Sequence, residues 1–154
     1  MRRIVVLAIG SRIMKDDGIA PRVIEHIEEN LIQLGVEVVI GETDFEFCIN
    51  KIKQDDFLII TDAMFSDDIP GSIKVLPINE ALVNQRRLYS QHEMNLFDWL
   101  ASMFINIEGY MIGIEVSEIC FGLELSSDLQ ERFEPICKEV EAIISRIVGG
   151  IRYA

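Results

Sequence analysis

The sequence has few cysteines and few basic residues, and each shortage excludes a class of protein. Its three cysteines, Cys48, Cys120 and Cys137, are widely spaced and form no C-x-x-C pair. This arrangement argues against a disulfide framework and against a zinc–thiolate site. The chain has 14 basic and 26 acidic residues, for a net charge of −12. Binding to phosphate backbones requires clustered Lys and Arg, so we expect no nucleic-acid partner.

Long hydrophobic runs are also missing. No apolar run approaches the roughly 18 residues that a membrane span requires, so we expect no membrane-spanning segment. The first apolar run, residues 4–9, stops at Gly10 and is followed by charged residues, without the cleavage site of a signal peptide. We therefore expect a cytoplasmic protein. Its 154 residues, 49% of them hydrophobic, suffice to bury a core, and we expect one domain over residues 1–154.

The apolar residues that are present predict alternating strands and helices. Runs typical of strands occur at residues 4–9, 36–40, 57–61, 73–76 and 110–114. Apolar side chains at helical spacing predict helices over residues 19–35, 45–53, 90–104 and 127–148. Residues 79–89 are poorly periodic, and we expect a loop there. Alternation on this scale indicates a mostly parallel sheet covered on both faces, with ligands bound beyond the carboxyl ends of its strands.

The last helix carries its own start and stop signals. Ser127 and Gln130 stand in capping-box register at its start. Pro135 lies inside the pattern and is expected to kink the helix or delay its start. Gly149 and Gly150 are expected to end it.

The loop after the first strand, residues 10–18, contains two adjacent acids, Asp16 and Asp17. It matches neither dinucleotide-binding nor P-loop patterns, and two aspartates would repel a phosphate. An Asp at a helix N-terminus usually accepts backbone N–H bonds. We expect one of the two to cap the following helix, which leaves the other free to face the strand ends, where a cation can bind.

Asp62 and His92 are the other candidate site residues. Asp62 directly follows the predicted strand 57–61, where it suits either chemistry or the start of a turn. His92 follows Ser90, which forms a capping box with Glu93 and so places His92 in a first helical turn. There the helix dipole favours the neutral, metal-binding imidazole, although an exposed histidine without a role is the plainer alternative.

Two carboxylates and one imidazole would form an open site rather than a closed structural metal site. Imidazole suits Ni, Zn, Cu or Fe, and carboxylates accept most divalent ions. The sequence has no H-E-x-x-H helix and no G-x-S-x-G elbow. None of the cysteines falls on the predicted rim beside His92, which disfavours a cysteine nucleophile.

Segments along almost the whole chain resemble the nickel–iron hydrogenase maturation proteases. They are Ile4–Ser11 with Asp16–Ile19, Leu58–Ala63, Ser90–Glu93 with Leu96, Gly113–Glu115, and Gly122–Ser126 with the last helix. The chain departs from the family pattern at Ser11, where Asn is usual, at Ala20 for Gly, at Val116 for Pro, and at Gly41–Thr43. The Ser11 change predicts altered hydrogen bonding in the first loop.

The resemblance implies a three-layer α/β/α sandwich with a twisted five-stranded, mostly parallel sheet containing one antiparallel strand. It also implies that Asp17, Asp62 and His92 are the catalytic, nickel-binding residues. The nickel would arrive in the precursor of the [NiFe] hydrogenase large subunit, whose C-terminal extension the enzyme removes. Nickel would anchor the precursor and could polarise the scissile carbonyl or a water, with either aspartate as an alternative general base.

Three other interpretations remain open from sequence. The first is a non-proteolytic accessory protein of the same fold that binds nickel or a partner. The second is a relative of the spore germination protease. The third and weakest is a flavodoxin-like nucleotide-binding module, which the acidic first loop disfavours.

Overall fold

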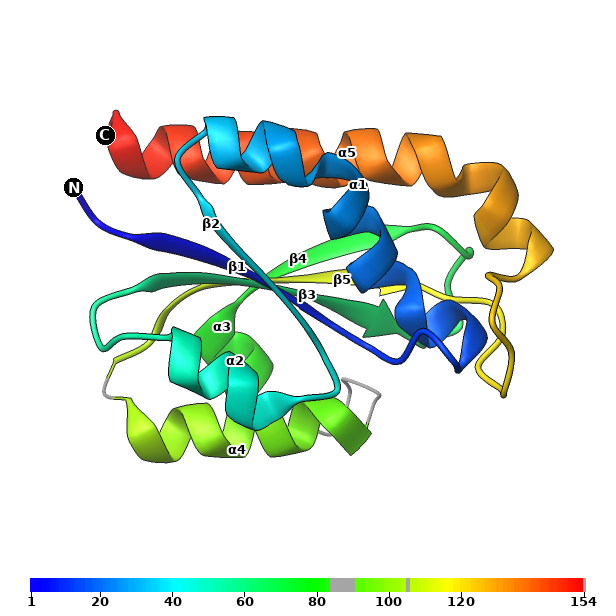
Figure 1. The fold of residues 1–154 in the computed structure, drawn as a ribbon, viewed down its shortest axis with the longest axis horizontal. Helices are drawn as coiled ribbons and strands as arrows, with labels where there is room; N and C mark the ends of the chain where they lie inside the picture. Colours follow the sequence, from blue (N-terminus) through cyan, green and yellow to red (C-terminus); the bar gives the residue numbers. More distant parts are fainter. Residues whose placement is uncertain (84–90, 105, 154) are drawn as a thin grey trace.

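A computed structural model describes the backbone of residues 1–83, 91–104 and 106–153. Side chains are described for the same residues except 82, 83 and 91–95. The strands form one five-stranded sheet in the order β2-β1-β3-β5-β4 (Figure 1). Its strands are β1 (Ile4–Ile9), β2 (Glu37–Glu42), β3 (Phe57–Met64), β4 (Ile73–Pro77) and β5 (Glu108–Glu115). All neighbouring pairs are parallel except β4 with β5.

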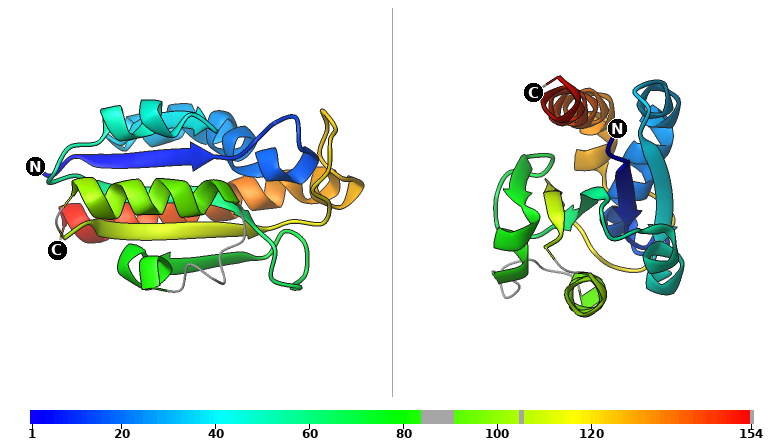
Figure 2. Two further views of the ribbon diagram at one scale, coloured as in Figure 1. Left: turned by 90° about the horizontal axis from the view of Figure 1, so that it is seen from below. Right: turned by 90° about the vertical axis from the view of Figure 1, so that its left-hand side faces the viewer.

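Helices cover both faces of this sheet, as Figure 2 shows. They are η1 (Lys15–Gly18, a 3-10 turn), α1 (Ile19–Gln33), α2 (Phe45–Lys51), α3 (Ile78–Val83), α4 (Gln91–Met103) and α5 (Ser127–Arg152). Alternate residues of β1 divide between two cores, because successive strand side chains point to opposite faces. Ile4, Val6 and Ala8 pack in the core beneath α1 and α5. Val5, Leu7 and Ile9 pack in the core beneath α2, α3 and α4.

The predicted fold class is confirmed: the protein is a three-layer sandwich with a five-stranded sheet and one antiparallel strand. All five predicted strands are present, and β3 and β5 are longer than predicted. Each of these two strands pairs with the other through Met64 and Glu115, and this partnership extends β3 beyond the end of its other neighbour, β1. No described helix is long and apolar enough to cross a membrane.

Three expectations about helices were wrong. The segment expected to be a loop opens with α3, which buries Ile78 and Ala81 in the core; residues 84–90 lie outside the description. The N-cap of α5 is Ser126 rather than Ser127. The helix also continues through Gly149 and Gly150, because Ile147, Val148 and Ile151 pack against the core on both sides of the glycine pair.

Pro135 lies inside α5 without delaying its start. A proline there removes one backbone hydrogen bond and crowds the preceding turn. In Figure 1 the first turns of α5, coloured orange, run at an angle to the rest of the helix, as expected for a kink.

The three cysteines differ sharply in reactivity. Burial, assisted by the nearby Asp44 charge, raises the pKa of Cys48 to about 11. Burial, assisted by Glu134 and Glu141, raises the pKa of Cys137 to about 12. Cys120 is exposed. Only a thiolate is nucleophilic, so the two buried thiols are inert near neutral pH.

We therefore expect a disulfide reagent such as dithiobis(nitrobenzoate) to modify one thiol per native chain near neutral pH. Cys120→Ser should abolish this reaction, and denaturant should release the two remaining thiols. Rapid modification of a second thiol in the native protein would contradict the assigned burial.

Candidate functional site

The chain turns tightly after β1 and brings Asp17 back towards the strand end. Gly10 adopts a φ of 137°, and a Cβ there would lie 1.9 Å from the carbonyl oxygen of Asp17, so only glycine fits. The Ser11 backbone N–H donates to Asp17 Oδ2 at 2.8 Å. The side chain of Asp17 is almost fully buried. Among the described side chains and backbone, no hydrogen bond to its second oxygen, Oδ1, is found.

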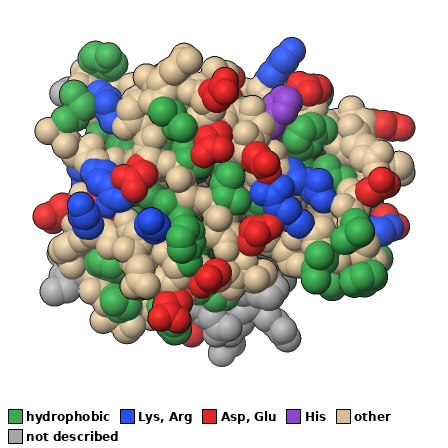
Figure 3. Space-filling view, viewed as in Figure 1, with side chains coloured by type: hydrophobic (Ala, Val, Ile, Leu, Met, Phe, Trp, Pro, Cys, Tyr) green, Lys and Arg blue, Asp and Glu red, His purple; other side chains and the backbone are tan. Residues whose placement is uncertain are grey.

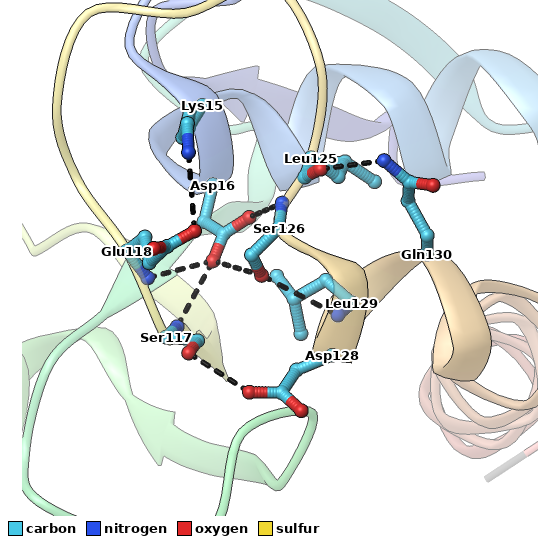
Figure 4. Close-up of polar contacts among 9 residues, drawn as sticks. All are labelled: Lys15, Asp16, Ser117, Glu118, Leu125, Ser126, Asp128, Leu129 and Gln130. Atoms are coloured by element: carbon cyan, nitrogen blue, oxygen red, sulfur yellow. Dashed lines mark hydrogen bonds and ion pairs between the residues drawn. The ribbon is translucent and has the colours of Figure 1, made fainter.

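Asp16 serves a different purpose from its neighbour: its carboxylate binds the loop that connects β5 to α5 (Figure 4). Oδ2 accepts hydrogen bonds from the backbone N–H groups of Ser117 and Glu118, at 3.0 and 2.8 Å, and from the Ser126 hydroxyl at 2.7 Å. Oδ1 accepts the Ser126 backbone N–H at 2.7 Å. Asp16 is fully buried, and these four bonds compensate for the loss of hydration.

Neither aspartate caps α1, so that expectation was wrong. The N-cap of α1 is Gly18, which offers no side-chain oxygen. The hydrogen bonds of Asp16 instead go to residues distant in sequence, which local helix rules do not anticipate. Ser126, in contact with Asp16, is also the N-cap of α5, and its hydroxyl oxygen accepts the Leu129 N–H at 3.5 Å. The acid therefore fixes the start of a distant helix.

Asp62 lies within β3 and not in a turn after it, which corrects the predicted strand end. It is fully buried, and its Oδ1 accepts the backbone N–H of Ala63 at 2.7 Å. The partner of Asp62 across the β3–β5 ladder is Gly113. Leu58 and Ile60 pack in the core beneath α4. By strand alternation Asp62 faces the same side, beyond the end of that core.

His92 belongs to the first turn of α4, but its side chain lies outside the described residues, as do Ser90 and the capping box. The helix itself is well placed. Leu96, Phe97 and Leu100 bury one face of α4. They pack in the same core as Leu58 and Ile60 of β3. Figure 1 shows its first turn at the end of the sheet where β1 and β3 finish. The backbone thus brings His92 to the edge where Asp17 and Asp62 lie.

These placements bring the predicted trio to one end of the sheet without testing it as a metal site. The turn carrying Asp17, η1, contacts β3 directly. Among the described side chains, no three of His, Cys, Asp and Glu are close enough to hold an ion, but this set does not include His92. The ligand roles of Asp17, Asp62 and His92 therefore remain a prediction.

Glu115 is a further buried acid, and the sequence analysis did not single it out as a candidate site residue. It ends β5 and is fully buried. Its carboxylate accepts the backbone N–H groups of Ser66 and Asp68, both at 2.8 Å, and the Ser66 hydroxyl at 3.1 Å. This acid fixes the loop after β3, much as Asp16 fixes the loop after β5. Its position in the sequence, directly after the buried strand predicted at residues 110–114, could have identified it.

A family model described as hydrogenase maturation protease matches residues 21–143 of the chain. The chain belongs to the hydrogenase maturation protease family. It is 26% identical over 148 residues to the hydrogenase 2 maturation protease of Escherichia coli K12, covering 92% of this chain and 90% of that one. A putative hydrogenase maturation protease of Methanocaldococcus jannaschii is 25% identical over 154 residues, covering 97% and 96%.

Solved structures agree with this assignment. The [NiFe] hydrogenase maturation protease HybD of Thermococcus kodakarensis is 27% identical, with a TM-score of 0.71 and coverage of 92% of this chain and 98% of that one. The hydrogenase maturating endopeptidase HybD of E. coli has a TM-score of 0.76 at 24% identity, covering 94% and 93%, and shares the fold. As a hydrogenase maturation protease, the chain is a peptide hydrolase.

The departure from the family pattern at Ser11 has a limited effect in this hydrogenase maturation protease. The hydrogen bond to Asp17 comes from the Ser11 backbone N–H, which any residue except proline can supply. Any change from the usual Asn therefore leaves this bond to the acid in place.

The two adjacent aspartates should respond differently to the same substitution. Asp16→Asn replaces one oxygen with an NH2 group, which must then face at least one N–H donor. We expect it to lower the free energy of unfolding by about 2–4 kcal/mol. Asp17→Asn keeps an oxygen for the Ser11 bond, the one hydrogen bond to this carboxylate among the described residues, and should cost under about 1 kcal/mol. Urea unfolding followed by circular dichroism measures both; equal losses would contradict the division of roles.

Proposed function

We propose that this protease removes the C-terminal extension of a [NiFe] hydrogenase large-subunit precursor and recognises the precursor by nickel already bound to it. The observation that carries the proposal is the difference between the adjacent acids. Asp16 uses both carboxylate oxygens within the protein. Asp17 lies beside it at the sheet end with one oxygen bound to Ser11. An oxygen without a described partner is suited to a ligand.

The donor set suits nickel carried by a substrate. Carboxylate oxygens and a neutral imidazole are acceptable nickel ligands, and three protein groups leave positions for ligands from the precursor. Asp17, Asp62 and His92 would supply these groups. When bound, nickel would hold the precursor and polarise a carbonyl or a water.

Hydrolysis also requires a group that accepts the proton of the attacking water. The water oxygen bonds to the acyl carbon, the C–N bond breaks, and the amine leaves with a proton. Asp17 or Asp62 would accept this proton as the general base and return it to the leaving amine. Cys48 and Cys137 are unsuitable nucleophiles, because burial keeps both protonated.

The rim around this end of the sheet suits a protein substrate. Large apolar side chains are exposed on the loops there, and such exposure commonly marks contact surfaces. They are Ile13, Phe65, Ile69, Ile119, Phe121 and Leu123. From the sequence, residues 65–71 and 79–89 were expected to contact the protein substrate. Phe65 and Ile69 lie in the first of these segments, and residues 84–90 of the second lie outside the description. The loop after β5 was not expected to contribute, although it carries three of the exposed apolar side chains.

A direct test is to incubate the protease with nickel-loaded and nickel-free precursor and to weigh the precursor by mass spectrometry. We expect loss of the C-terminal extension only from the nickel-loaded form. An unchanged mass of the nickel-loaded precursor would contradict the proposed cleavage. It would favour an accessory role in which the protein binds nickel or a partner. Equal cleavage of both forms would remove nickel from the account.

The same assay tests the three residues. Asp17→Asn, Asp62→Asn and His92→Ala should each lower the cleavage rate by roughly a hundredfold or more, the usual scale for an acid–base or electrostatic group. Asp128→Asn is a matched control, because Asp128 is an acid near the same end of the sheet that accepts the Ser117 hydroxyl at 3.0 Å and is not one of the three proposed ligands. Full activity in any of the three variants would remove that residue from the site.

A further inference from the structure

A cavity of about 550 Å³ lies between the first half of α1 and the start of α5, outside the site described above. The residues that line it are Arg12, Arg22, Glu25, His26, Leu125, Gln130 and Phe133. One wall is apolar, formed by Leu125 and Phe133. Arg12 and Arg22 add two guanidinium groups to the lining, which is unusual in a chain with a net charge of −12. Figure 3 shows Lys and Arg side chains gathered on this face near α1.

The two arginines differ in how far their charge is already neutralised. Arg12 pairs with Glu25 at 2.5 Å and with Glu42 at 2.7 Å. Burial tends to lower the pKa of Arg12, but its bonds to both glutamates outweigh burial and raise it. Arg12 is therefore a fixed part of the wall, and its charge is balanced within the protein.

Arg22 is not balanced in this way. Its Nη2 donates to the Leu123 carbonyl oxygen at 2.7 Å, which holds the side chain in place. Its Nε is buried without a hydrogen-bond partner among the described residues. A buried donor of a charged group costs free energy unless it is paired, so binding of an acceptor beside Arg22 would recover part of that cost. No ion pair of Arg22 occurs within the described part of the chain.

The remaining polar groups of the cavity restrict the chemical class of ligand that it can bind. Gln130 donates through Nε2 to the Leu125 carbonyl oxygen at 2.7 Å, so its own oxygen faces away from that bond. His26 lies 3.5 Å from Glu134 and packs edge-on against Phe133 at 5.5 Å between ring centroids. A guanidinium with an unused donor beside an aromatic ring and a leucine matches a carboxylate adjacent to an apolar side chain.

We propose that this cavity is a subsite for a carboxylate of the polypeptide substrate, held by Arg22, with an apolar side chain on Phe133 and Leu125. The inference rests on the proposed function, because it supplies a second point of attachment for the same precursor. The backbone runs from Asp17 through the end of the 3-10 turn η1 and the first turn of α1 to Arg22, a rise of roughly 8 Å at about 1.5–2 Å per residue. Roughly two to three residues of extended peptide span that distance. A segment bound at the sheet end can therefore reach the cavity.

Three short peptides test the chemistry without any cleavage. One is N-acetylated glycine–alanine–leucine with a free terminal carboxylate, the second is its C-terminal amide, and the third is an amide with glutamate in place of glycine. Each is titrated into the wild-type protein by ¹H–¹⁵N NMR, with the Arg22 Nε–H and the His26 and Phe133 amides as reporters. We expect saturable shifts with the free acid, and roughly tenfold weaker binding of the plain amide.

The glutamate-containing amide distinguishes the two sources of the carboxylate. If it binds as tightly as the free acid, the subsite takes an acidic side chain; if it binds like the plain amide, the subsite takes a chain terminus. Both results support a carboxylate subsite. Equal affinity for all three peptides, or no shift at the reporters, would overturn it.

Variants link the cavity to the substrate. Arg22→Gln should weaken the best peptide by roughly tenfold and raise the KM for nickel-loaded precursor with kcat unchanged. Arg22→Lys keeps the charge, so its affinity for the peptide should lie between those of the wild type and of Arg22→Gln. Arg146→Gln, an exposed arginine of α5 outside this cavity, is the matched control. A loss in Arg146→Gln equal to that in Arg22→Gln would reject the subsite.

The peptide titration and the cleavage assay test the subsite and the proposed function independently, so either proposal can be rejected without the other. Peptide binding without any precursor cleavage would contradict the proposed protease function and leave the carboxylate subsite intact. Nickel-dependent cleavage with no peptide binding, and with Arg22→Gln kinetics equal to wild type, would reject the subsite alone.

Discussion

The carboxylate of Asp16 joins segments of the chain that the sheet alone would leave apart. It accepts four hydrogen bonds from Ser117, Glu118 and Ser126, in a fully buried position. The backbone N–H of Asp16 in turn donates to the Glu118 carbonyl oxygen at 3.2 Å. Hydrogen bonds to a charged, buried acceptor are strong, and losing one leaves a costly unpaired group. The loop after β1, the loop after β5 and the start of α5 are therefore held as one unit.

This constraint separates stability from chemistry at two adjacent residues. Asp16 faces the β5–α5 loop and uses its oxygens there, whereas Asp17 is turned back towards Ser11 and the strand end. Gly10 permits the turn because its backbone conformation and its contact with Asp17 leave no room for a side chain. Function at this edge thus depends on an acid that would not itself touch the substrate.

Much of the fold was readable from the sequence because local patterns determine it. Buried β-branched runs predicted all five strands, and helical spacing predicted α1, α4 and α5. The pairing of β3 with β5 was not readable, so Asp62 was placed after its strand rather than within it. The helix α3 and the continuation of α5 through Gly149 depend on tertiary packing, which overrides weak local propensity.

In the candidate site, too, local sequence patterns predicted some features, and others depend on tertiary contacts. Position along the chain indicated Asp17, Asp62 and His92 as separate candidates, and the resemblance to the maturation proteases named them together. Which of Asp16 and Asp17 is structural depends on a loop about a hundred residues away, and no spacing rule contains that contact. The Arg22 cavity likewise requires α1 and α5 to be adjacent, which sequence alone did not establish.

If the acids at the end of the sheet bind the precursor's nickel, that nickel gains ligands when the precursor binds the protease. Nickel K-edge X-ray absorption of the precursor, alone and in complex with the protease, tests this most directly. We expect nickel in the wild-type complex to gain oxygen or nitrogen ligands, and nickel in the complex with the Asp17→Asn, Asp62→Asn double variant to gain none. An identical nickel coordination shell in the free precursor and in the wild-type complex would contradict it.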